Sequence, residues 1–486
     1  MNDCLPECRS KGCRVGTLLA ILVAFTLVAC SGADDHSNTS QSQPNSLGNY
    51  GIPIAGCEQY NYTGCEITEP SCQQSVFELV KCVRKTPNGT LPPVTTITAA
   101  EYKNQLTQSS SNSNPTESQK QENSLVMVGL ASSGDLTVSS QVDVLVNTVG
   151  AYYTSDEKKV YIIRPDTAPT ETELQQQALT LAHEFVHALQ DQDYDLTQYD
   201  KDNDKTYDST LAASSIVEGE ADYYASLLRA AFDGLTPDQV NYAVRCANAA
   251  TYVETTYASD SPVLIAPRMF PYFYGGPYVA LELQAEGRSG VDSLFASPPP
   301  ASLPFIVSQG SLVDPQLNPV TNAGPTPVAG SALFYEDTLG AWLTYEYLKR
   351  ISGGTLTPLP AVSGWLGDHV WVYSDADTTV TSNIAVVWRV RFAAESDVTN
   401  FINRTNLATV PLLNGTAVSR HAFALNGDAV VVAVTGTFDQ VQWEDAVKAA
   451  ATAAASSPSP TGASNAAAAS PSLTRLLLTS VPRVGH

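Results

Sequence analysis

The spacing of apolar residues changes along the chain and predicts a hairpin followed by a long helix. Between residues 141 and 165, two apolar runs flank a polar turn, a pattern typical of a β-hairpin. Residues 170–192 carry apolar side chains at helical spacing, and Thr170 with Glu173 three positions later fits a capping box. This helix is therefore expected to be amphipathic, with its apolar face formed by Leu174, Ala178, Ala182, Phe185, Val186 and Leu189.

Helical periodicity recurs further along the chain, at roughly 207–232, 237–257, 274–287 and 333–351. From residue 365 to residue 450 the pattern becomes strand, helix, strand, which predicts a small α+β unit. The chain as a whole is therefore expected to belong to the α+β class.

The region before the hairpin is predicted to contain a strand, a short helix and a polar loop. A β-prone run over 92–98 leads into a short predicted helix at 99–106. The polar run that follows, residues 107–124, is expected to form a mobile surface loop.

The N-terminus has the pattern of an export signal. Residues 16–29 are apolar or small, a run of 14 residues that is too short to cross a bilayer core of about 30 Å. The run ends in Leu27 to Cys30, which resembles the lipobox of bacterial lipoproteins. That resemblance implies cleavage before Cys30 and attachment of lipid to it. An ordinary signal peptide with a cysteine at this position is the alternative.

Four of the nine cysteines lie within 26 residues, at Cys57, Cys65, Cys72 and Cys82. In an exported protein this clustering predicts two disulfides, although four cysteines allow three connectivities. A metal site is the weaker alternative, because the segment has no C-x-x-C pair and no nearby histidine. Cys246 is left over and is expected to be a buried thiol.

Composition narrows the classes of partner. The hydrophobic fraction of 43% predicts a globular body, and the net charge of −23 argues against a nucleic-acid partner, which requires clustered basic residues. The expected divisions are a signal peptide (1–29), a flexible tether (30–48), a cysteine-rich segment with linker (49–124), a main domain (125–360), an α+β unit (361–450) and a low-complexity tail (451–486).

The predicted helix over 170–192 carries a motif with metal chemistry. His183 and His187 lie one turn apart and face the same way, so both imidazoles can bind one Zn²⁺. Glu184 completes the H-E-x-x-H pattern and can act as the general base that takes a proton from zinc-bound water. Two surface histidines on a helix are the alternative interpretation.

A zinc ion that keeps a position for water needs a third protein ligand, and both Glu218 and Glu220 are available on the next helix. Here the chain resembles the gluzincin metallopeptidases, the clan of thermolysin, in which a ligand Glu on a downstream helix is followed four residues later by an Asp. The resemblance selects Glu218 as the ligand. It implies that Asp222 hydrogen-bonds His183.

The resemblance also implies a zincin-like metallopeptidase domain, one Zn²⁺ per chain and endopeptidase activity. It suggests that residues 158–165 form an edge strand that holds the substrate, with an ordinary core hairpin as the alternative. Asp191 parallels an acid that follows the second histidine in thermolysin-like enzymes. The residue that stabilises the oxyanion is left open among Tyr223, Tyr224, His369 and His421.

Two functions are compatible with these observations. The first is a zinc peptidase in the bacterial cell envelope, anchored to a membrane through lipid on Cys30 and acting on a peptide or protein. The second is a non-catalytic surface lipoprotein in which a structural zinc site braces two helices while the α+β unit binds a partner or glycan. The intact Glu184 favours the enzyme, because a structural site needs the ligands but no base. The oligomeric state is left open.

The lipobox interpretation predicts that the mature protein begins at a lipidated Cys30. Mass spectrometry of the N-terminal peptide should show a diacyl or triacyl mass on that residue. An unmodified N-terminus at another position would contradict the lipid anchor.

Overall fold

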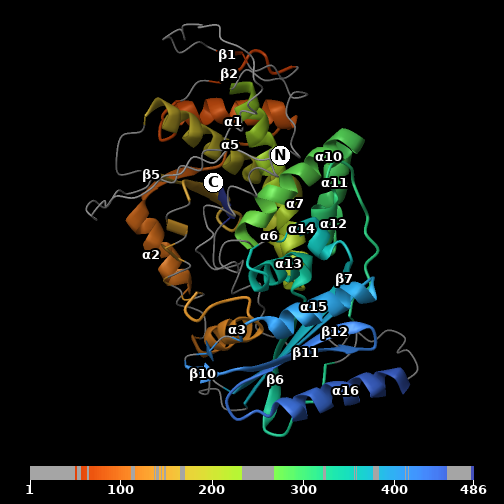
Figure 1. The fold of residues 1–486 in the computed structure, drawn as a ribbon. Helices are drawn as coiled ribbons and strands as arrows, with labels where there is room; N and C mark the ends of the chain where they lie inside the picture. The colour runs from red at the N-terminus through yellow and green to blue at the C-terminus, as the bar shows by residue number, and fades with distance from the viewer. Residues whose placement is uncertain are drawn as a thin grey trace, which may run out of the picture.

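The computed structural model describes residues 50–51, 56–62, 65–110, 115–135, 137, 139, 142–143, 145–146, 149–164, 170–232, 267–320, 324–354, 356, 358–375, 383–410, 412–413, 415–456 and 483–485. The fold is mixed α+β with several sheets, as expected for the class (Figure 1). Within these residues, no helix combines the length and the apolar character needed to cross a membrane.

A four-stranded sheet in the order β13-β4-β5-β3 lies beside the long helices. The predicted hairpin is confirmed, because β4 (Ala151–Thr154) pairs antiparallel with β5 (Lys159–Arg164). On its other side β5 pairs in parallel with β3 (Val94–Thr98), and β13 (Arg483–Gly485) pairs with β4. The prediction that residues 158–165 offer a free edge to a substrate is therefore wrong, since β5 is hydrogen-bonded on both sides.

The helix α5 (Glu171–Tyr194) begins as predicted. The Thr170 side chain accepts a hydrogen bond from the backbone of Glu173, and the Glu173 side chain accepts one from the backbone of Thr170. Its apolar face packs against α1 (Pro70–Arg84), where the rings of Phe77 and Phe185 meet edge to face with centroids 5.3 Å apart.

The cysteine-rich segment is closed by two disulfides, Cys57–Cys82 and Cys65–Cys72. The expectation of two disulfides among these four cysteines is confirmed. The first disulfide ties the chain before α1 to the last turn of that helix, and Cys57 and Cys72 are buried against the apolar core that α1 shares with α5. The segment is thus part of the packed body rather than a separate appendage.

The second long helix, α7 (Tyr207–Phe232), runs beside α5 and is packed very closely against a π-helical turn, η2 (Pro271–Gly275). Gly219 and Gly275 allow this approach. A Cβ added at Gly219 would lie 2.6 Å from the carbonyl oxygen of Gly275 and closer still to its carbonyl carbon. The two backbones therefore touch at this point, and any side chain would force them apart.

The five-stranded antiparallel sheet forms the opposite end of the molecule (Figure 1). Its order is β11-β12-β8-β7-β6. The predicted strand–helix–strand pattern after residue 365 is confirmed. The strands are β6 (Ser331–Asp337), β7 (Trp365–Asp375), β8 (Ile384–Phe392), β11 (Ser419–Leu425) and β12 (Asp428–Val434), with helices α15 (Glu395–Leu407) and α16 (Gln440–Ser456).

The helix expected over 333–351 is shorter than predicted. Its first residues form β6, and the helix α13 begins only at Gly340 and ends at Ile351. Gly340 has a φ of +83°, and the Asp368 carboxylate accepts hydrogen bonds from the backbone N–H groups of Leu339 and Gly340. A buried carboxylate from β7 thus determines where α13 begins, which helical periodicity could not indicate.

Residues 107–110 and 115–124 of the polar run are helical, so the expectation of a surface loop is wrong for these described residues. Helix α2 (Ala99–Ser110) extends into the run, and α3 (Pro115–Val128) follows and lies against the five-stranded sheet (Figure 1). Lys120 and Ser124 are buried there and hydrogen-bond Ser374 and Tyr335. Polar side chains can be buried when distant residues satisfy them, and local composition does not show those partners.

Shorter elements complete the described structure: β1 (Tyr50–Gly51), β2 (Asn61–Tyr62), α6 (Leu196–Asn203), α10 (Gly276–Glu286), α11 (Arg288–Ala296), α12 (Leu303–Val307), α14 (Pro358–Val362), β9 (Leu412–Leu413) and β10 (Thr416–Ala417). The predicted helix over 237–257, Cys246, the signal peptide, Cys30 and most of the tail lie outside the described residues.

The backbone contact between α7 and η2 predicts that Gly219→Ala destabilises the protein. Alanine favours a helix over glycine by about 1 kcal/mol, but overlap with rigid backbone costs up to about 3 kcal/mol. The thermal unfolding midpoint of the metal-free protein should therefore fall. Gly150→Ala is the control, because its added Cβ would meet nothing closer than the Thr180 methyl group at 3.8 Å. Equal stability of the two variants would contradict the close contact.

Candidate metal centre

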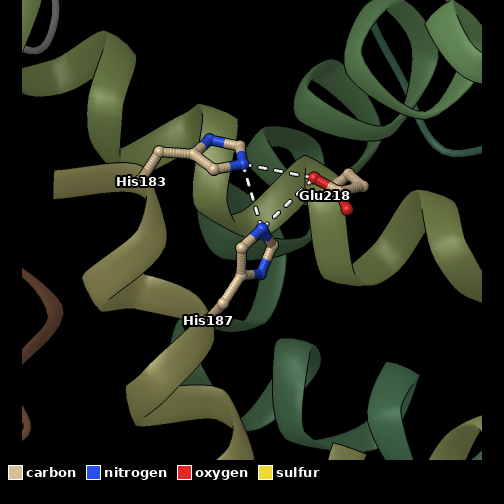
Figure 2. Close-up of side chains that lie close together, drawn as sticks. All are labelled: His183, His187 and Glu218. Carbon is tan, nitrogen blue, oxygen red and sulfur yellow. Dashed lines mark hydrogen bonds and ion pairs between the residues drawn. The ribbon is translucent and has the colours of Figure 1, made fainter. Parts of the chain in front are cut away.

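Three side chains from two helices converge at one point. His183 and His187 project from successive turns of α5, and Glu218 projects toward them from α7 (Figure 2). The Nε2 atoms of the two histidines are 3.0 Å apart, and Glu218 Oε2 lies 3.2 Å from His183 Nε2 and 3.3 Å from His187 Nε2. All three residues are buried, and together they form a group that could hold a metal ion.

The donor atoms and their spacing fit zinc. Zn²⁺ takes imidazole nitrogens and carboxylate oxygens, and ligands at about 2.0–2.1 Å from a tetrahedral centre lie roughly 3.3 Å from one another. The three separations of 3.0, 3.2 and 3.3 Å are close to the edges of one face of such a tetrahedron. Within the described residues this group has three members, which is the number of protein ligands in catalytic zinc sites.

The Glu218 carboxyl is held in its ionised form. Burial alone raises the pKa of Glu218, but the adjacent imidazoles of His187 and His183, when protonated, attract its negative charge and lower the pKa well below its ordinary value. A carboxylate that stays ionised at neutral pH is the form that binds a metal.

Glu184 lies on α5 directly after the first histidine and is fully buried. Two tyrosines are close enough to interact electrostatically with the Glu184 carboxylate. Burial chiefly raises the pKa of Tyr102 and of Tyr272, and the Glu184 carboxylate raises both further. The candidate base therefore sits in an interior, water-poor environment beside the metal group, where a carboxylate interacts more strongly with nearby charges than it would in water.

Glu220, the other candidate third ligand, faces away from the histidines. Its carboxylate is fully buried and pairs with Arg84 Nε at 3.0 Å and Arg288 Nη1 at 2.8 Å. It also accepts a hydrogen bond of 2.9 Å from Gln190 Nε2. Although burial raises the pKa of Glu220, the two arginines and these hydrogen bonds lower it overall.

Asp222 follows Glu218 by one turn of α7 and is partly buried. Its carboxylate lies close to Gly276 at the start of α10 and affects the hydroxyl of Tyr272 electrostatically. The predicted hydrogen bond between His183 and the Asp222 carboxylate stays a prediction. Asp191 has a structural role at the end of α5, where it accepts hydrogen bonds from Tyr153, Lys158 and the backbone of Leu196.

The candidate oxyanion residues are not equally placed. His369 on β7 pairs with Glu336, and His421 on β11 pairs with Glu444 of α16, so both histidines belong to the five-stranded sheet. The sequence did not single out Tyr272, which lies on η2 at the metal group: its ring stacks on His183 with centroids 5.9 Å apart, and its hydroxyl hydrogen-bonds Glu218. Sequence spacing carries no signal for it, because η2 reaches the site only through the contact with α7.

Comparisons with protein-family models, with curated proteins and with solved structures found no match to this chain.

The geometry predicts different effects for the two neighbouring glutamates. Glu218→Gln removes an anionic ligand and should abolish stable zinc binding, whereas Glu220→Gln leaves all three ligands in place and should still give about one zinc per chain at saturation. Metal analysis of the purified variants, each incubated with excess zinc and then desalted, decides between them. Full zinc in Glu218→Gln together with loss in Glu220→Gln would reverse the assignment.

Proposed function

We propose that the protein is a zinc-dependent peptidase of the gluzincin type. The observation that carries the proposal is the position of Glu184, a fully buried carboxylate next in the chain to one member of a three-residue group of two histidines and a glutamate. A structural zinc site needs four protein ligands and no base. A three-ligand group with an adjacent carboxylate is the arrangement that zinc-dependent peptide hydrolysis uses.

Each residue has a role in this proposal. A bound zinc ion supplies Lewis-acid chemistry, by polarising the scissile carbonyl and making water more acidic. His183, His187 and Glu218 would hold the ion, and Glu184 would accept the proton of the attacking water and pass it to the leaving amine. Tyr272, whose hydroxyl is kept protonated by burial and by the nearby carboxylates, would donate a hydrogen bond to a substrate oxygen.

The proposed substrate is a peptide or protein outside the cytoplasm. The two disulfides favour an oxidising compartment, where such bonds persist. They accord with the export signal and with an anchor through Cys30 in a bacterial cell envelope. The alternative is a surface lipoprotein whose zinc site is only structural, and zinc binding without peptide cleavage would favour it.

The proposal predicts cleavage that depends on Glu184. The zinc-loaded mature protein is incubated with a diverse peptide mixture, and products are identified by mass spectrometry. Glu184→Gln removes the general base, so its rate of cleavage should be about 10²- to 10⁴-fold lower than that of the wild type. Its zinc binding should be retained.

The matched control is Glu157→Gln, the same exchange at an exposed position in the β4–β5 turn, which should leave the rate unchanged. A zinc chelator should stop the wild-type reaction. Cleavage that persists in Glu184→Gln, or a wild-type protein that binds zinc and cleaves nothing, would contradict the proposed activity.

A further inference from the structure

The side chain of Gln190 connects the metal group to a buried cluster of charges. Gln190 lies on α5 three residues after His187, so both side chains are on the same face of the helix. Its Oε1 atom is 2.8 Å from His187 Nδ1, and its Nε2 atom is 2.9 Å from Glu220 Oε2 and 2.9 Å from the backbone carbonyl of Val217. All these side chains are fully buried.

The chemistry of these partners determines which way the Gln190 amide points. An ionised carboxylate and a backbone carbonyl can only accept hydrogen bonds, so both require the NH₂ end of the amide. The carbonyl end must then face His187 and can only accept. His187 Nδ1 therefore carries a hydrogen, so that in the neutral imidazole, the form that binds a metal, the Nε2 lone pair is directed to the point that His187 shares with His183 and Glu218.

Glu220 is held in its acceptor role by two guanidinium groups. Arg84 contacts both carboxylate oxygens, at 3.0 and 3.3 Å, and Arg288 contacts Oε1 at 2.8 Å. Both arginines also pair with Asp193, at 2.7 and 3.2 Å. Arg84 is 1% exposed, and it is the last residue of α1, two positions after the disulfide-bonded Cys82.

We propose that Gln190 is a positioning residue for the metal centre: held by Glu220 and Arg84, it imposes on His187 the tautomer that can bind a metal through Nε2. This inference rests on the proposed metal centre, and it identifies the hydrogen bonds and ion pairs that orient one of the ligands of that centre. Through Arg84, the disulfide-stapled helix α1 becomes part of this network. The centre would bind a divalent cation such as Zn²⁺. The role of Gln190 concerns the tautomer of His187 and does not depend on a change of its charge.

The test measures zinc affinity by competition with a chelator. Gln190→Leu removes all three hydrogen bonds of this side chain while nearly keeping its volume, and zinc affinity should fall by about 10- to 100-fold, as is typical when the partner of a ligand histidine is lost. Gln192→Leu is the matched control, because Gln192 is exposed on the same helix and bonds only the backbone of Thr90; its affinity should stay within about twofold of wild type.

A second measurement reports the tautomer itself. In protein labelled with ¹⁵N-histidine, long-range ¹H–¹⁵N spectra distinguish an imidazole with hydrogen on Nδ1 from one with hydrogen on Nε2. Zinc-free wild-type protein should show His187 as the Nδ1–H form, and Gln190→Leu should show a mixture. Should Gln190→Leu fail to fold, Glu220→Gln replaces it. Its amide can also donate, so the amide of Gln190 is then oriented only by the Val217 carbonyl, and zinc affinity should fall by a smaller factor.

The outcomes separate the two proposals. Unchanged zinc affinity and an unchanged tautomer in a folded Gln190→Leu, or in Glu220→Gln, would overturn the positioning role while leaving the peptidase proposal standing. A wild-type protein that binds zinc, shows the expected loss in Gln190→Leu and cleaves no peptide would support the positioning role and remove the peptidase. A wild-type protein that binds no zinc would overturn both.

Discussion

The rotation of α7 about its own axis is the constraint on which the candidate site depends. Glu218 and Glu220 are two residues apart, about 200° around the helix. One faces the histidines of α5 and the other faces Arg84 and Arg288. Neither can move without the other, because rotating Glu218 out of the metal group would leave Glu220 as an unpaired buried charge. Breaking a buried pair of this kind costs about 3–5 kcal/mol.

The remaining elements are arranged around that helix. The contact between Gly219 and Gly275 brings η2, and with it Tyr272, against Glu218. On the opposite side, α1 and α11 each contribute one arginine to Glu220. The site therefore draws on segments that are far apart in the chain. Its geometry depends on tertiary packing more than on any single motif.

Features encoded over a few residues could be predicted from the sequence. The capping box at Thr170, the β4–β5 hairpin and the pairing of His183 with His187 on one helix face are all local, and the structure contains each of them. Gln190 lies one helical turn after His187, but its role depends on acceptors from α7 that no local pattern reveals.

Features that depend on distant partners could not be predicted. Strand β5 is an inner strand because β3, some sixty residues earlier, pairs with its free side. The polar residues of α3 are buried because the five-stranded sheet supplies hydrogen bonds to them. The start of α13 is determined by Asp368, which belongs to a later strand. In each case the residues that determine the local structure are too far away in the sequence to affect the local pattern of apolar and polar positions.

In the proposed metal centre, His183, His187 and Glu218 together hold one zinc ion with a position left for substrate or water. X-ray absorption spectroscopy of the zinc-loaded protein tests it most directly. The zinc ion should be surrounded by two imidazole nitrogens and two oxygens, one from the carboxylate and one exchangeable, all at about 2.0–2.2 Å. A spectrum with sulfur ligands, or without the scattering pattern of two imidazoles, would contradict it.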